Sequence, residues 1–154
     1  LSQDGLIVIV LTMDSSTGEV IENLIFRNID ILEHDEDDPM YQGCMTVDCG
    51  DRNRVRNVLF EDIRVEHIQE GRLFYVKVRF NPKYDRQPGS SIEGVVFRNI
   101  TYTGVGENRS LIQGLSRDGM VRNVTFENVT INGEKMRDLK EAVTNEFISN
   151  VSVK

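Results

Sequence analysis

The chain has 154 residues, 39% of them hydrophobic, which is enough for one domain with a substantial core. Its formal net charge of −7 argues against a broad nucleic-acid-binding surface. No apolar run approaches the roughly 18 residues of a membrane-spanning helix, so we expect neither nucleic acid nor a membrane as a partner. The sequence shows no signal peptide and opens on Leu1, so we interpret it as a processed chain or a piece of a longer protein.

Four repeat segments of eleven residues organise the chain. Each reads apolar, charged, Asn or Gly, apolar, any residue, Phe, charged, Asn or Asp, apolar, any residue, apolar. They are Ile21–Ile31 (IENLIFRNIDI), Val55–Val65 (VRNVLFEDIRV), Ile92–Tyr102 (IEGVVFRNITY) and Val121–Ile131 (VRNVTFENVTI). Their phenylalanines are 34, 37 and 29 residues apart, a spacing typical of stacked structural units.

The spacing of the apolar positions predicts strands that turn corners. Within each segment these positions are separated by steps of three, two, three and two residues; steps of two indicate a strand, and each step of three requires a bend. The bends fall at the third and eighth positions, which hold Asn, Asp or Gly, the residues that best tolerate a left-handed backbone. We therefore predict an all-β fold, a single-stranded parallel β-helix. It would contain a phenylalanine stack inside and an Asn/Asp ladder at a bend. The alternative, a helical repeat, is disfavoured by the β-branched residues and the mid-segment Asn.

The stretches between the repeats supply further elements. Leu6–Leu11 is apolar throughout, as in a strand buried on both faces or one covered by another coil. In chain order we expect strands at Leu6–Leu11, Gly43–Cys49, Gly71–Phe80, Ser110–Leu115 and Glu146–Val153, and a short helix within Glu134–Ala142. The whole chain, residues 1–154, would be a single β-helix domain of four to five coils, about 4.8 Å apart.

Two stretches offer groups that could carry chemistry. The acidic loop Glu33–Pro39 (EHDEDDP) has enough carboxylates for a calcium ion but no glycine spaced as in a calcium loop, so a solvated loop is the alternative. His34 and His67 both follow the last strand of a repeat, so they could form a stacked acid/base or metal pair in neighbouring coils, or be two polar surface positions.

The remaining sequence motifs argue against a disulfide, a cofactor and a metal site. Cys44 and Cys49 are five residues apart on one expected strand and would point to opposite faces, which argues against a disulfide between them. Among the glycosylation sequons only Asn108 lies in a loop. The sequence has no phosphate loop, zinc-ligand spacing or serine elbow, so we expect no cofactor and no metal site.

The strongest binding candidate is basic. From Arg72 to Arg86 there are five Lys or Arg and one Asp in a chain that is otherwise acidic. Alternation along the strand puts Tyr75, Lys77 and Arg79 on one face, opposite an apolar face of Phe74, Val76, Val78 and Phe80. An aromatic ring beside two cations suits a carboxylated sugar, although an exposed strand with solubilising charges would have the same pattern.

The repeats resemble the right-handed parallel β-helix of polygalacturonase-like glycoside hydrolases (family 28 and bacterial relatives), which implies a right-handed, single-stranded β-helix of the pectate-lyase type. The stretch GDRNRVRNVLFEDIRVEHIQEGRLFYVKVRFNPKYD is similar to the C-terminal half of such bacterial proteins, and the tail with INGEKM and NEFISNVSVK is similar to their C-terminus. The resemblance covers essentially the whole chain but only the last part of the family's length. It indicates the fold well and the substrate poorly.

The resemblance implies an inverting hydrolase, in which one carboxylic acid protonates the leaving oxygen and other carboxylates activate a water molecule. The family's acids lie in Asn-Thr-Asp and Asp-Asp motifs, followed by Gly-His-Gly and Arg-Ile-Lys. The sequence contains no Asn-Thr-Asp, Asp37-Asp38 precedes a proline in a loop, and no Gly-His-Gly histidine is present. Gly71-Arg72-Leu73 falls near the Arg-Ile-Lys strand, which implies substrate-binding roles for Arg72, Lys77 and Arg79, with Tyr75 beside them.

We therefore expect the C-terminal segment of a carbohydrate-active enzyme, a glycoside hydrolase acting on pectin-like or related acidic polysaccharide, whose catalytic acids lie upstream of residue 1. This chain alone would be inactive, and its partner would be a polysaccharide or oligosaccharide. One alternative is a non-catalytic carbohydrate-binding or structural β-helix module; a weaker one is a polysaccharide lyase. The resemblance implies a secreted or periplasmic location. An exposed strand edge near Leu6–Leu11 would favour self-association through the N-terminal coil.

Overall fold

A computed structural model describes residues 7–11, 18–35, 43–104 and 109–154. Within these ranges the chain is all β, and it contains no helix. The strands are β1 (Ile7–Leu11), β2 (Val20–Ile31), β3 (Gly43–Cys49), β4 (Arg54–Val65), β5 (Arg72–Val78), β6 (Ser91–Tyr102), β7 (Leu111–Gln113), β8 (Met120–Ile131), β9 (Glu134–Lys135), β10 (Val143–Thr144) and β11 (Ile148–Val153).

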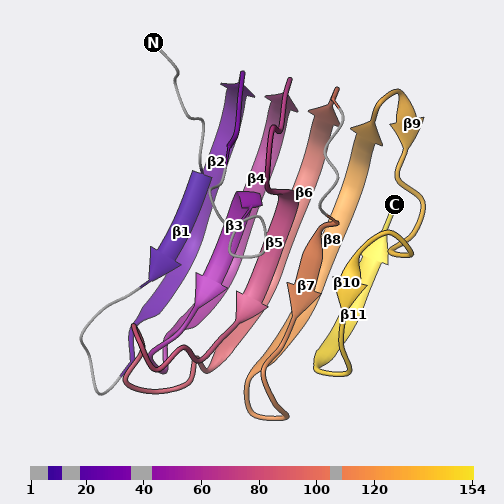
Figure 1. The fold of residues 1–154 in the computed structure, drawn as a ribbon. Helices are drawn as coiled ribbons and strands as arrows, with labels where there is room; N and C mark the ends of the chain where they lie inside the picture. The colour runs from indigo at the N-terminus through magenta and orange to yellow at the C-terminus, as the bar shows by residue number, and fades with distance from the viewer. Residues whose placement is uncertain (1–6, 12–17, 36–42, 105–108) are drawn as a thin grey trace.

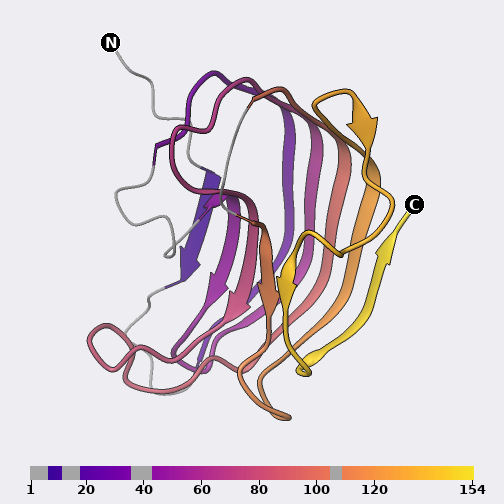
Figure 2. The same ribbon diagram turned by 45° about the vertical axis from the view of Figure 1, so that its right-hand side comes forward.

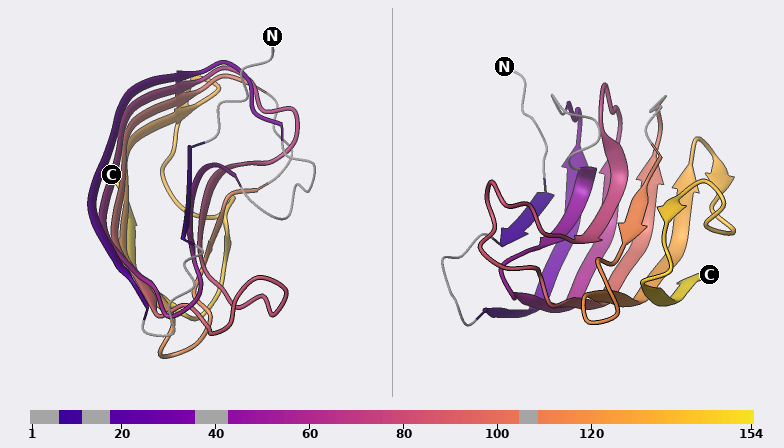
Figure 3. Two further views of the ribbon diagram at one scale, coloured as in Figure 1. Left: turned by 90° about the vertical axis from the view of Figure 1, so that its left-hand side faces the viewer. Right: turned by 60° about the horizontal axis from the view of Figure 1, so that its bottom comes forward.

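The strands form two parallel sheets that face each other (Figures 1 and 2). The short-strand sheet has the order β1-β3-β5-β7-β10, and the long-strand sheet has the order β11-β8-β6-β4-β2, with β9 antiparallel to β8. Viewed along the stack, successive coils superimpose, with the bent long strands on one side and the short strands on the other (Figure 3). The predicted parallel β-helix is thus confirmed.

Two details of the prediction were wrong. The solenoid has about three turns rather than four to five, and its C-terminal strands are short, six residues in β11 and two in β10. The helix expected within Glu134–Ala142 does not form: the stretch contains β9 and turns, because Asn132 and Gly133 have positive φ and reverse the chain back onto β8.

The corners have the predicted backbone. Every third and eighth repeat position has φ between 52° and 76°: Asn23, Asn28, Asn57, Asp62, Gly94, Asn99, Asn123 and Asn128. Their side chains form two ladders from coil to coil. The third-position ladder includes Asn57 to Asn23 and Asn150 to Asn123, and the eighth-position ladder includes Asn99 to Asp62 and Asn128 to Asn99. The bends are therefore fixed by residue type, and most of them also by a side-chain bond to a neighbouring coil.

The core between the sheets contains the predicted aromatic stack. Phe26, Phe60, Phe97 and Phe126 are in register, with neighbouring ring centroids 5.1 Å apart and nearly parallel planes. Phe74 of the short-strand sheet packs across the core against Phe97, at 4.5 Å between centroids. Hydrophobic burial therefore joins the two sheets, and the ring contact of Phe74 adds to it.

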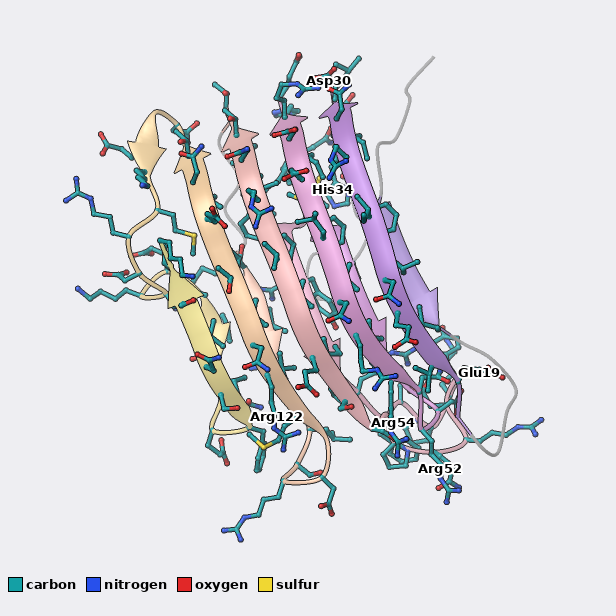
Figure 4. The ribbon with its side chains drawn as sticks, turned by 180° about the vertical axis from the view of Figure 1, so that it is seen from behind. Glu19, Asp30, His34, Arg52, Arg54 and Arg122 are labelled. Atoms are coloured by element: carbon teal, nitrogen blue, oxygen red, sulfur yellow. The ribbon has the colours of Figure 1, made fainter. Side chains whose placement is uncertain are left out.

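The outward face of the long-strand sheet carries charges that alternate in sign from coil to coil. In the second repeat position the row is Glu22, Arg56, Glu93 and Arg122; in the seventh it is Arg27, Glu61, Arg98 and Glu127. Figure 4 shows this face, with Glu19 and Asp30 near the two ends of β2 and Arg122 on β8. Ion pairs join neighbouring coils, including Arg56–Glu22 at 2.7 Å and Arg98–Glu127 at 3.1 Å.

Candidate functional site

Three neighbouring coils align polar groups on the outward side of the short-strand sheet. The register places Asp48 of β3 beside Lys77 of β5, and Lys77 beside Gln113 of β7. The residues that alternate with these along each strand, such as Val47 of β3 and Val76 of β5, point inward and are buried in the core. A carboxylate, an ammonium group and an amide therefore lie in one row across the coils.

A buried ion triad lies at one end of this row. Arg79 Nε is 2.7 Å from Asp48 Oδ2, and Arg79 Nη1 donates to Asp85 Oδ2 at 2.6 Å. All three side chains are at most 8% exposed. Asp85 also accepts the backbone N–H of Asn81, and a Cβ on Gly50 would lie only 2.5 Å from Asp85 Oδ1, so glycine is required there. The triad thereby anchors the loop after β5 against the end of β3.

The ionisation of Asp48 reflects this burial. Loss of solvent raises the pKa of Asp48 to about 6, and the facing Arg79 guanidinium opposes part of that rise. A carboxylic acid that titrates near neutrality has the property a general acid needs. Asp48 is nevertheless only 2% exposed and is bound by Arg79, so in this conformation no substrate atom reaches it. We interpret the triad as an anchor of the loop.

The structure divides the four predicted substrate-binding residues. Arg72 is 3% exposed and donates to the backbone carbonyl of Arg109; Tyr75 is also buried; Arg79 is held in the triad. Lys77 remains partly exposed. Tyr75 and Lys77 share the outward face as expected, but Phe80 does not continue the apolar face: β5 ends at Val78, and Phe80 is 43% exposed.

A half-open cavity of about 470 Å³ lies between the ends of β6 and β8 and the start of β5. Its volume is within the range of small-molecule sites. Arg109 forms one wall, and its side chain donates to the backbone carbonyls of Glu141 and Ala142. The backbone carbonyl of Arg109 in turn accepts a hydrogen bond from the side chain of Arg72. The remaining lining combines apolar with charged side chains, including Ile68, Leu73, Phe74, Ile131, Met136, Glu134, Lys135, Arg137 and Asp138.

The other candidates give no assembled site. The backbone N–H of His34 donates to the backbone carbonyl of His67, so the two residues lie in neighbouring coils as predicted. The side chain of His34 is buried, whereas His67 is exposed. Most of the acidic loop, from residue 36, and Asn108 lie outside the described residues. Among the described residues no group of three His, Cys, Asp or Glu could hold a metal ion. Cys44 and Cys49 are both free and buried.

Sequence reasoning missed Asp48 and Asp85 as partners of Arg79. A signal for Asp48 was available, because it is an acidic residue in an otherwise apolar strand and its partner coil carries Lys77. Asp85 had no comparable signal, since its position depends on how a loop folds back.

Comparison with known proteins adds no further assignment. No protein-family model, no curated protein and no solved structure matches the chain. In the described part of the chain, no helix is long and apolar enough to cross a membrane.

Proposed function

We propose that this chain is the C-terminal β-helix segment of a glycoside hydrolase acting on pectin-like acidic polysaccharide, and that it supplies substrate-binding rather than catalytic groups. The observation that carries the proposal is Lys77, a partly exposed cation on the outward face of the short-strand sheet with Gln113 beside it in register. An ammonium group binds the carboxylate of a uronic acid, and an amide bonds sugar hydroxyls.

The burial of the acidic residues supports the non-catalytic part of the proposal. Inverting hydrolysis needs two accessible carboxyl groups with room for water between them. Asp48 and Asp85 bind the same guanidinium and are buried. We place the proposed catalytic acids in a part of the enzyme outside this sequence because the sequence lacks the family's Asn-Thr-Asp motif and the triad does not supply them. Action on an extracellular polymer would require secretion or export to the periplasm.

Binding should be tested with two polymers that differ in charge alone. Calorimetric titration with polygalacturonate should show binding, and highly methyl-esterified pectin, whose carboxylates are masked, should bind much more weakly. Lys77→Gln should weaken polygalacturonate binding by about tenfold, the worth of one charge-assisted hydrogen bond. Lys140→Gln is a matched control, because Lys140 is 84% exposed and pairs with Asp138. Equal binding of both polymers, or no effect of Lys77→Gln, would reject the site.

Activity measurements separate the remaining alternatives. The proposal expects no release of reducing ends from polygalacturonate by this chain, and such release would contradict the non-catalytic role. A calcium-dependent rise in unsaturated product would instead support a lyase. Absence of both binding and activity would favour the second candidate, a structural β-helix module; the closed triad, which keeps Asp48 and Asp85 away from solvent, supports a module in which these two acids are not catalytic.

A further inference from the structure

The two ends of the long-strand sheet differ from its middle. The inward residues of β4 and β6, among them Phe60 and Phe97, are fully buried, whereas the equivalent residues of β2, including Leu24 and Phe26, remain partly exposed. The outward residue Ile25 is 60% exposed. Among the described strands, β2 is the last of its sheet and bonds to β4 alone. Its open edge therefore presents backbone groups together with an incompletely covered apolar row.

The outward charges of β2 match those of a strand inside the stack. Every interface between repeat strands opposes unlike charges at the second and seventh positions, from β2 against β4 to β6 against β8. The seventh-position row extends further: backbone bonds between Lys154 and its β8 neighbours place this lysine opposite Glu127. A strand added beside β2 would continue the alternation if it carried a basic residue opposite Glu22 and an acidic residue opposite Arg27.

We propose that the open edge of β2 is a docking edge for a parallel β-strand of the same repeat with this charge order, basic at the second position and acidic at the seventh. Docking would add backbone hydrogen bonds, cover Phe26 and Leu24 with like residues, and give Glu22 and Arg27 opposite charges on a second side. The strand is one that the upstream part of the proposed longer protein would supply, so the proposal rests on that part of the proposed function but does not depend on sugar binding.

A second copy of the chain would not supply the required charge order beside β2. In a head-to-tail stack, β11 of one copy would lie beside β2 of the next, and the repeat register would set Lys154 opposite Arg27. Its outward residue Ser149 would lie opposite Glu22 and leave it without a cation. Like charges directly opposite each other destabilise strand pairing, so the ladder disfavours this stack.

The chain itself provides the probe. A labelled peptide of residues 54–65 (RVRNVLFEDIRV), the sequence of β4, has the required order through Arg56 and Glu61. The control peptide carries Arg56→Glu and Glu61→Arg and differs in nothing else. By fluorescence anisotropy at low salt, the first peptide should bind the intact chain at least about tenfold more tightly. Hydrogen exchange measured by mass spectrometry should show slower exchange of β2 amides with the first peptide.

Variants of the chain test whether the charge order of β2 determines which peptide binds. In the Glu22→Arg/Arg27→Glu double variant the protection of β2 should transfer to the charge-exchanged peptide, which purely structural roles of Glu22 and Arg27 would not produce. Circular dichroism melting establishes that the double variant is folded. Arg27→Glu alone, which gives each peptide one unlike and one like pair and should abolish the preference, serves if it is not. Equal binding of the two peptides, no binding of either up to millimolar concentration, or protection confined to β11 would overturn the proposal.

Discussion

The two outward faces of the solenoid use the same ion pair in opposite settings. On the long-strand sheet, arginines and carboxylates alternate in solvent-facing rows, as at Arg56–Glu22, where both side chains are at least 40% exposed. On the short-strand sheet, Arg79 meets Asp48 and Asp85 at similar distances but with almost no exposure. Exposed pairs are screened by water and salt and contribute little individually, whereas a buried charge that loses its partner is severely destabilising. Distance alone therefore does not indicate which pairs hold the fold.

The largest expected effect comes from removing the shared cation of the buried triad. Arg79→Ala would leave two carboxylates buried without their guanidinium and should lower the free energy of unfolding by about 3–5 kcal/mol. Urea denaturation at pH 7 measures this loss. The matched change on the other face, Arg27→Ala, removes a half-exposed arginine and should have little effect. Equal losses in the two variants would show that burial does not distinguish the faces.

The pH dependence of stability should identify Asp48. The folded carboxyl keeps its proton up to a pKa of about 6, while the unfolded one releases it near 3.8. The folded state thus binds more protons between these values, and the contribution of Asp48 to stability should fall by about 3 kcal/mol as pH rises from 3 to 8, most steeply between pH 4 and 6. Asp48→Asn removes this contribution. Subtracting its urea midpoints from those of the wild type across pH 3–8 isolates it, and a flat difference would contradict the raised pKa.

A charge reversal tests the exposed rows. Hydrogen bonds from Arg27 and Arg98 lower the pKa of Glu61, which lies between these arginines. Glu61→Arg would place three cations in neighbouring coils and should lower the melting temperature, less than Arg79→Ala does. The loss should shrink as salt rises from 10 mM to 1 M, because exposed charges are screened. Glu61→Gln is the neutral control, and a loss that is independent of salt would point to packing.

The smallest effect concerns the gap in the third-position ladder. Gly94 provides no amide, so Asn123, which accepts from Asn150 on one side, donates to Glu93 on the other. Gly94→Asn keeps a residue that tolerates φ of 76° and should stabilise the fold by about 1 kcal/mol or less. Its Cβ would lie 3.1 Å from Asn57 Oδ1, the mobile end of a side chain. Gly94→Ala, which adds a Cβ but no amide, should destabilise. Thermal melts of both variants compare the two contributions.

Sequence reasoning was accurate where a structural constraint recurs in every coil. Corners recur at fixed positions, so one Asn such as Asn57 could be interpreted with its counterparts, and the Phe60 stack followed from the same register. The alternating charges were equally visible as Glu, Arg, Glu, Arg in the second position, but their signs were not compared between repeats. The coil count was too high: the solenoid has about three turns, and the strands become short at its C-terminal end, where β10 has only two residues.

The candidate site was harder to predict because it depends on a single loop. Alternation correctly placed Lys77 outward, but it could not show that β5 ends at Val78 or that the chain returns Asp85 to Arg79 six residues later. Nothing repeats in that loop, so no second copy constrained its interpretation. The role of Lys77 in binding a carboxylated sugar remains a prediction.

The alternating rows also make the coil pair, and not the single coil, the modular unit of this solenoid. Excising one coil would bring Glu22 opposite Glu93 and Arg27 opposite Arg98, although every apolar position and corner would still superimpose. Excising two adjacent coils would instead bring Glu22 opposite Arg122 and Arg27 opposite Glu127, which preserves the pairing. Lengthening or shortening the stack should therefore be tolerated best in even steps, a parity rule that its hydrophobic core does not impose.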